Sequence, residues 1–312
     1  MDKLLITCTN DDKDGGIYLW EINRGTISRI YEYQCMGISR YKNYYAIASQ
    51  SLEQNTMYLD GIPNGHFQHS IICLDNKFNI ASEAPVSIFG MGDLHDIIVF
   101  DSKVWVVDTI GNRIIVFQIT NKYKKGCLPF GYSEFIFPLL EWRDPNAQEP
   151  DSSHMNGICI TKKNIIVSAF GRFSKYREYV NRRDDGCIMD ITDLFKPFGM
   201  SQTFEEPRIV KNKIYDPHSI VMHDNDLYYV ESKKRRIVKN WQTLLEFDLG
   251  YVRGLFIRKN FLFVGFSKSR HSDTDENFNC NVLMLDIKNH NKKLNSANIP
   301  SKEIYSFVNV LP

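Results

Sequence analysis

Hydrophobic and polar residues alternate along most of the chain with a period of two, which predicts β-strands rather than helices. One arrangement recurs five times: an alternating run, a short polar turn, and a second run rich in β-branched and aromatic residues. The first residues of these units, which we call head residues, are Met36, His95, Asn156, His218 and Arg253. An aliphatic residue follows each head two positions later, at Ile38, Ile97, Ile158, Ile220 and Leu255. The shared internal spacing indicates a structural repeat.

Each unit has room for a small antiparallel sheet. Third strands are expected at "SIICLD", "RIIVFQI", "CIMDI" and "NVLMLDI", each after a turn or loop. Repeats of this size built from short strands are typical of a β-propeller, whose blades bury their faces against each other. The pattern therefore predicts an all-β chain that forms one propeller domain over residues 1–312.

The two ends of the chain predict how the ring closes. The N-terminal "KLLITCTN" resembles the second strand of a unit, and "GIYLWEI" and "ISRIYEY" continue it. No first strand precedes them, but the C-terminal "EIYSFVNV" can supply one. This predicts six blades, one of them shared by the N- and C-termini. In a five-bladed alternative, "EIYSFVNV" is instead the outer strand of the last repeat.

Composition narrows the class of protein. A net charge of +1 gives no general reason to expect binding to nucleic acid or membranes. The N-terminal apolar run "LLITC" is too short for a signal peptide. The seven cysteines fall mostly inside predicted strands, as at Cys73, Cys159 and Cys187, which is typical of buried thiols in a reducing compartment. We therefore expect a cytoplasmic protein whose partner is a small molecule or another protein.

The head residues converge in this fold, because the first strands of all blades line the central channel and run the same way. His154, two residues before Asn156, points to the same side as the head. Three histidines, His95, His154 and His218, thus approach one mouth of the channel. The other five are expected in loops or turns: His66, His69, His223, His271 and His290.

Three converging imidazoles are a candidate site for a divalent transition metal, zinc foremost. Three protein ligands leave one position open for water or substrate. Asp96 and Asn156 are candidate partners that fix the histidine tautomers. The alternative is a polar channel lining that binds an anion or another polar ligand without metal.

Arg253 adds a positive charge to the same ring. Its planar guanidinium suits a carboxylate or phosphate group of a substrate, unless it forms an ion pair with Asp96, Asp216 or Glu231. A basic and aromatic insertion, residues 170–186, is placed either to cover the channel mouth or to cover a blade edge. As a cover it would present Arg172, Tyr176 and Arg177 to the ligand.

Several of these motifs also carry a family resemblance. "HDIIVFDSKVWVVDT", "HMNGICI", "DGCIMDI", "PHSIVMHDNDLYYVES" and "VRGLFIRKNFLFVGFSKSR" resemble, in order, an uncharacterised bacterial family, domain of unknown function 4915. The resemblance extends from His95 to Ile287. Because members of that family are regarded as β-propellers, it implies this fold and the axial placement of the histidines and Arg253.

A second resemblance suggests chemistry. "LHDIIVFDSKVWVVDTIGNRIIVFQ" is similar to the NHL-type repeat of the peptidylglycine-amidating lyase propeller, which holds an axial zinc ion with one histidine from each of three blades. His95 and His218 match that pattern, whereas His154 stands two residues before the matching position. The three histidines and the positive charge of Arg253 together predict a metal-dependent lyase or hydrolase acting on a small anionic or oxygen-rich substrate, which Arg253 anchors. The alternative function is a non-catalytic propeller that binds a small ligand or partner protein at the channel mouth.

Overall fold

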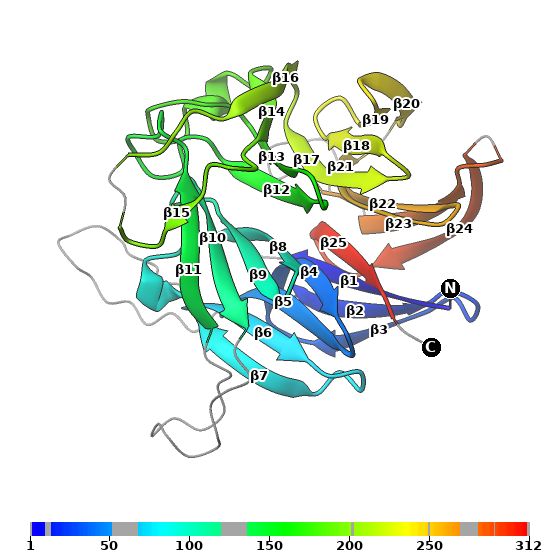
Figure 1. The fold of residues 1–312 in the computed structure, drawn as a ribbon. Helices are drawn as coiled ribbons and strands as arrows, with labels where there is room; N and C mark the ends of the chain where they lie inside the picture. Colours follow the sequence, from blue (N-terminus) through cyan, green and yellow to red (C-terminus); the bar gives the residue numbers. More distant parts are fainter. Residues whose placement is uncertain are drawn as a thin grey trace.

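The computed structural model forms a β-propeller of six blades around a central channel (Figure 1). It describes residues 2–9, 14–51, 68–119, 136–200, 203–248, 250–268, 280–289 and 291–310. The innermost strands, in ring order, are β25 (Glu303–Asn309), β4 (Gln34–Tyr41), β8 (Leu94–Phe100), β12 (Met155–Ile160), β17 (Pro217–His223) and β21 (Tyr251–Arg258). The six-bladed prediction is confirmed.

The remaining strands form three further layers. The second strands are β1 (Lys3–Thr9), β5 (Tyr44–Ser51), β9 (Lys103–Asp108), β13 (Ile165–Ala169), β18 (Asp226–Glu231) and β22 (Phe261–Ser267). The third are β2 (Gly16–Glu21), β6 (Gln68–Leu74), β10 (Arg113–Ile119), β14 (Gly186–Asp190), β19 (Arg236–Lys239) and β23 (Cys280–Asp286). The outer strands are β3 (Thr26–Tyr31), β7 (Ile80–Pro85), β11 (Ile136–Arg143), β16 (Arg208–Ile214), β20 (Gln242–Glu246) and β24 (Lys292–Ile299). A short strand, β15 (Lys196–Pro197), extends the β8 blade beyond β11.

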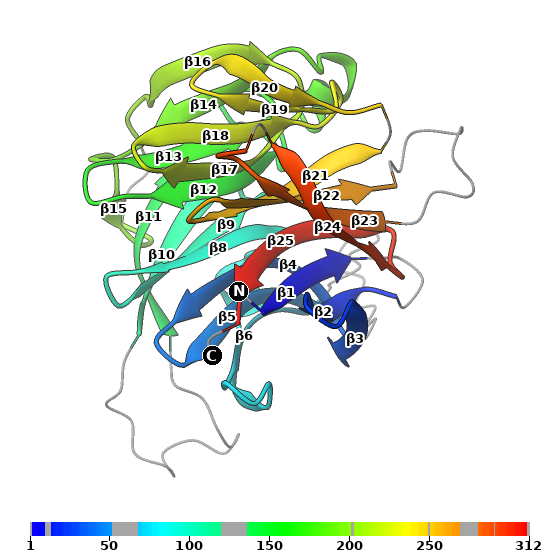
Figure 2. The same cartoon turned by 90° about the vertical axis from the view of Figure 1, so that its right-hand side faces the viewer.

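The two ends of the chain complete one blade together. β25 pairs antiparallel with β1, with Val308 opposite Leu5, and Figure 2 shows the two strands side by side. The C-terminal strand is therefore the innermost strand of the first blade, as the sequence predicted. The five-bladed alternative is wrong, because "EIYSFVNV" is not an outer strand of the last repeat.

Burial explains why the strands differ in composition. Blades pack face to face, so strands such as β13 are buried on both faces and are almost entirely apolar. The outer strand β7 alternates between exposed and partly buried positions. Trp20 of the first blade meets Phe263 of the last edge to face at 6.3 Å, which seals the closing interface.

Every innermost strand carries a β-bulge at or directly after its head residue. In β25 the pairing skips Tyr305, because Ser306 is opposite Thr7 and Ile304 is opposite Cys8. Tyr305 is therefore the sixth head residue. A bulge adds one residue to a strand and redirects its side chain, so these bulges orient the six heads at the channel.

The residue after each head is small or polar, because it faces the backbone of the next blade. A Cβ atom at Gly37 would lie only 2.5 Å from the backbone nitrogen of Ile97. Where the position is not glycine it links blades, as in Ser219, whose hydroxyl accepts a hydrogen bond from the Gly254 amide at 3.1 Å.

Two short 3₁₀ helices accompany the strands, η1 (Ser87–Phe89) and η2 (Glu178–Asn181). In the described part of the chain, no helix has the length and apolar character needed to cross a membrane.

The prediction that five histidines lie in loops or turns is wrong for two of them. His69 lies within β6 and His223 ends β17. His69 is buried because it sits on a third strand, between blades, and its sequence setting gave no sign of this. The other three, His66, His271 and His290, are outside the described residues.

Candidate functional site

Two rings of mostly polar side chains surround one mouth of the channel. The head ring consists of Met36, His95, Asn156, His218, Arg253 and Tyr305. The second ring contains the residues two positions earlier: Gln34, Asp93, His154, Asp216, Tyr251 and Glu303. Most of these side chains are buried. Buried polar groups need hydrogen-bond partners, so the partners decide which atoms remain free to react.

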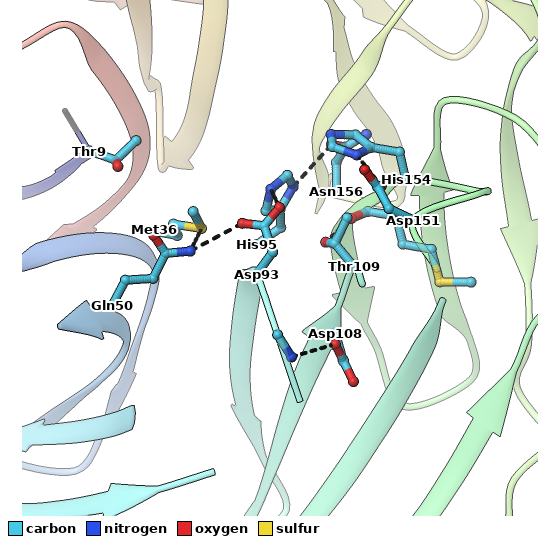
Figure 3. A network of polar contacts seen from close by, with 12 residues as sticks. Thr9, Met36, Gln50, Asp93, His95, Asp108, Thr109, Asp151, His154 and Asn156 are labelled. Carbon is cyan, nitrogen blue, oxygen red and sulfur yellow. Dashed lines mark hydrogen bonds and ion pairs between the residues drawn. The ribbon is translucent and has the colours of Figure 1, made fainter. Parts of the chain in front are cut away.

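His95 lies between two oxygen acceptors (Figure 3). Its Nε2 is 3.1 Å from Asp93 Oδ2, and its Nδ1 is 3.3 Å from Asn156 Oδ1. The Asn156 amide donates to the Pro217 carbonyl at 3.1 Å, which turns its oxygen towards His95. Both ring nitrogens of His95 therefore face an oxygen atom. Although burial opposes it, His95 holds the pKa of Asp93 well below its usual range.

His154 is fixed by one carboxylate and two aromatic rings. Its Nδ1 is 2.6 Å from Asp151 Oδ1, and Tyr179 donates to the other oxygen of Asp151 at 2.9 Å. The imidazole stacks between Phe170 and Tyr179, with ring centroids 4.5 and 4.6 Å away. Because Asp151 accepts the Nδ1 proton, the lone pair of His154 is on Nε2, which has no hydrogen bond to any described residue. Burial lowers the pKa of His154, opposed by Asp151.

His218 has the opposite arrangement. Its Nε2 accepts from Arg253 Nε at 3.1 Å and Nη2 at 2.9 Å. Its Nδ1 faces the Asp216 carbonyl at 3.0 Å and the Ser232 hydroxyl at 2.8 Å. Because that hydroxyl donates to the Val252 carbonyl at 2.6 Å, it accepts from His218. Burial, and next the charge of Arg253, lower the pKa of His218 well below its usual value. Both ring nitrogens are therefore occupied.

Arg253 is held in a buried ion pair across the closing blade. Its Nη1 is 2.7 Å from Glu303 Oε2, and both side chains are almost fully buried. The Tyr305 ring lies 4.4 Å from the guanidinium carbon, within cation–π distance. Burial opposes the charge, but Tyr305 and Glu303 raise the pKa of Arg253 above its ordinary value. Its charge is thus compensated within the protein.

The sequence suggested Asp96, Asp216 or Glu231 as the ion-pair partner of Arg253, but the partner is Glu303. Asp216 pairs with Arg183 at 3.0 Å, and Glu231 pairs with Arg236 at 2.9 Å. The partner of Arg253 comes instead from the C-terminal strand. Only ring closure brings that strand beside β21, so neighbouring sequence carried no signal for it.

Asp96 connects blades and does not orient a histidine. Its two oxygens accept from the backbone amides of Ile97 at 2.9 Å and Ile158 at 3.0 Å. Burial raises the pKa of Asp96 to about 7, although both amides oppose the shift. The prediction that it fixes a tautomer is therefore not supported by its contacts. Asn156, in contrast, does contact the His95 ring.

The donors of the predicted metal site do not fit a three-histidine centre as they are arranged here. His95 and His154 are neighbours, with ring centroids 4.9 Å apart. Phe170 packs against both His154 and His218, and the lone pair of His218 faces Arg253. Across the described ranges, no group of three or more His, Cys, Asp or Glu side chains is placed to hold a metal ion. Metal binding stays a prediction that needs its own test.

The insertion at residues 170–186 contacts the histidines of the channel mouth, but not with the side chains that the sequence suggested. Phe170 and Tyr179 stack on His154. Arg172 is instead engaged with Asp144 at 2.8 Å, and Tyr176 is exposed. Arg177 donates to the Tyr179 hydroxyl at 3.0 Å.

Several residues of the site were missed from the sequence, among them Asp93, Asp151, Tyr179, Glu303 and Tyr305. Extending the repeat to the C-terminal strand would have found Tyr305 as its head and Glu303 two residues earlier. No pattern marked Asp151 or Tyr179, because Asp151 lies in a loop before β12 and Tyr179 lies in η2 of the insertion, outside the repeat.

Several solved structures have a similar fold. A chain of a nidogen/laminin complex matches with a TM-score of 0.59 and 12% identity, covering 99% of this chain and 98% of that one. The periplasmic gluconolactonase of Pseudomonas aeruginosa matches with a TM-score of 0.54 and 9% identity, covering 99% of both chains. A luciferin-regenerating enzyme matches with a TM-score of 0.52 and 11% identity, covering 87% of this chain and 78% of that one. Such low identities show the propeller fold alone.

The sequence relationships are narrower. No curated protein matches the chain. The family described as Domain of unknown function (DUF4915) matches residues 83–311, which is most of the chain. Together with the six-bladed fold, this match shows that the chain belongs to the DUF4915 family.

Proposed function

We propose that this propeller is a hydrolase or lyase that acts on a small anionic or oxygen-rich substrate at the head ring, with His154 as general base. The observation that carries the proposal is the 2.6 Å hydrogen bond from His154 to Asp151. It fixes the tautomer and leaves Nε2 as a proton acceptor, the arrangement in which a carboxylate orients a catalytic imidazole.

The surroundings of His154 suit proton transfer. Burial lowers its pKa, so the imidazole is neutral and able to accept a proton at neutral pH. In a hydrolase it would activate water, and in a lyase it would remove a proton from the substrate. Stacking between Phe170 and Tyr179 limits rotation of the ring and excludes bulk water from its faces.

His95 lies beside His154 in the same site. Its ring centroid is 4.9 Å from that of His154. Because its two ring nitrogens face Asp93 and Asn156, it would contribute by holding these side chains in place beside the general base. Arg253 contributes indirectly, since Glu303 already compensates its charge. In this proposal it orients His218 and the wall of the site, and it would anchor a substrate anion only by sharing its N–H groups with Glu303.

The substrate class to test first is suggested by the fold. The gluconolactonase of similar architecture shows that a propeller of this kind supports a hydrolytic enzyme, although the two chains share only 9% identity. Lactones are small and oxygen-rich, as the site requires, and their ring-opened products are anionic. Cyclic and linear esters are therefore the first compounds to assay.

The experiment compares His154→Gln with His218→Gln on a panel of lactones, esters and small hydroxy acids. Loss of a general base typically lowers the rate by a factor of 10² to 10⁴, and we expect this for His154→Gln. His223→Gln is the matched control, because His223 ends β17 at the other end of the channel. Wild-type activity in His154→Gln would contradict the proposal. Substrate binding without turnover in the wild type would favour the non-catalytic alternative.

A further inference from the structure

We propose that the opposite mouth of the channel binds a small oxyanion, a phosphate or carboxylate group, between Arg40 and Arg258. Arg40 lies near the end of β4 and Arg258 ends β21. β25 contacts both strands, and its last residue is Asn309 (Figure 1). These residues follow their heads by four or five positions, which is roughly 13–17 Å along a strand. The proposed site is therefore separate from the head ring.

The two arginines converge on one buried amide. With its oxygen turned towards them, Asn309 accepts a hydrogen bond from Arg40 Nη1 at 3.1 Å and another from Arg258 Nη1. The opposite orientation would set the amide NH₂ group against the guanidinium donors. Asn309 is only 6% exposed, so its oxygen is a fixed acceptor that brings two positive charges together.

No carboxylate compensates this pair in the part of the chain that the structure describes. The ion pairs there involve other arginines, such as Arg113, Arg183 and Arg253. Two guanidinium groups that share one oxygen repel each other, and the repulsion is reduced when an anion lies between them. Each group keeps further N–H donors that Asn309 does not use, and these donors suit the oxygens of a carboxylate or phosphate.

The hairpin turns around this mouth strengthen the positive field. Lys42 follows Arg40 by two positions, and Lys259 directly follows Arg258. The corresponding turn of the β12 blade carries Lys162 and Lys163, and all four lysines are exposed. The hairpins of the two intervening blades carry the acids Asp101, Asp224 and Asp226, and Asp226 is paired with Lys239 at 2.7 Å. Clustered charge of one sign raises the local concentration of counter-ions, so the mouth as a whole attracts anions.

The test measures binding of inorganic phosphate and, separately, acetate by isothermal titration calorimetry at constant ionic strength. We expect the wild type to bind at least one of them, and Arg40→Gln or Arg258→Gln to weaken that binding at least tenfold. Lys259→Gln is the matched control, since it removes a charge from the same mouth without touching Asn309, and should change the affinity less than threefold. The acetate arm separates carboxylate from phosphate recognition.

One further variant and a folding control make the result unambiguous. His154→Gln should bind the anion as the wild type does, which separates this site from the head ring. Arg40 is exposed, so Arg40→Gln should fold normally, and circular dichroism melting checks this. Absence of binding in the wild type, or undiminished binding in both arginine variants, would overturn the proposal. So would binding that is lost in Lys259→Gln as completely as in Arg258→Gln, because that would be a general surface charge effect.

Discussion

His154 and His218 occupy the same mouth of the same channel, yet their chemistry differs. Both are buried, and both have a lowered pKa. The proton donor that faces His218 is a permanently charged arginine, so its Nε2 lone pair is used. The partner of His154 is a carboxylate that takes its proton, so the Nε2 lone pair is left available. The reactivity of a histidine here follows from its hydrogen-bond partner and not from its place in the repeat.

The two sides of the ring also differ in how they balance charge. On one side, Asp93 and Asp151 each face one imidazole. On the other, a single buried ion pair joins Arg253 to Glu303 across the closing blade. On the first side the Nε2 lone pair of His154 is available, whereas on the second side removal of either member of the buried pair leaves the other without its partner. We therefore propose that the chemistry belongs to the His154 side and that the Arg253 side has a structural role.

The largest expected effect comes from breaking the structural side. Glu303→Gln leaves the charge of Arg253 buried without its partner, which typically costs about 3–5 kcal/mol of unfolding free energy. Urea denaturation measures the loss. Glu205→Gln is the control, because Glu205 and Lys196 form an exposed pair, and such pairs contribute only about 0–1 kcal/mol. Similar losses in the two variants would mean that Glu303 has no special role in closing the ring.

The second effect is a dependence of stability on pH, which arises from His69, the histidine that contacts the Asp93 backbone. His69 accepts a hydrogen bond from the Asp93 backbone amide at 3.0 Å, and burial lowers the pKa of His69 to about 4. Between this value and the ordinary pKa of about 6.5, the unfolded chain binds more protons than the folded protein. Stability is therefore complete above about pH 6.5 and falls as the pH drops towards 4.

The expected contribution of His69 over that interval is about 3 kcal/mol, from about 1.4 kcal/mol for each unit of pKa difference. His69→Gln can still accept the Asp93 amide hydrogen but does not titrate. The measurement is the unfolding free energy at several pH values between 4 and 7 for both proteins. An unchanged slope in His69→Gln would show that His69 is not buried as a neutral group.

The smallest expected effect concerns the amount of metal that the purified protein contains. Because Arg253 occupies the lone pair of His218, we expect protein purified without a metal-binding tag to contain well under one zinc, iron, copper or nickel per chain. Elemental analysis measures this beside His95→Ala/His218→Ala. About one metal ion per chain in the wild type, lost in that variant, would show that the three histidines bind a metal. It would also show that Arg253 does not keep His218 from acting as a ligand.

The comparison of His154 with His218 can be tested further by removing the hydrogen bonds that Arg253 donates to Nε2 of His218. In Arg253→Met/Glu303→Leu both members of the buried pair are replaced by apolar groups, a change that is often neutral for stability. The Nε2 lone pair of His218 is then free to bind a metal. We expect zinc affinity to rise in this variant relative to the wild type, measured by competition with a chromophoric chelator. No gain would show that Phe170, rather than Arg253, keeps the imidazoles from acting together.

The sequence by itself determined the fold of this protein. Strand alternation and turn residues are local features that repeat at a shared spacing, so they predicted six blades with a strand shared by the two termini, with five blades as the alternative. They also predicted five of the six residues at the heads of the innermost strands, all except Tyr305. His95, His154 and His218 were placed at one mouth for this reason, and the structure brings them to that mouth.

Only the tertiary structure decided what these side chains do. Ring closure put Glu303 and Tyr305 of the last strand beside Arg253, and the insertion brought Tyr179 of η2 against the His154 ring. The hydrogen bonds of His95 to Asn156 and of His218 to Arg253 join residues far apart in the chain, whereas Asp151 is only three positions from His154. Such contacts leave no periodic trace in a single sequence, because each depends on one partner at one place in the folded ring.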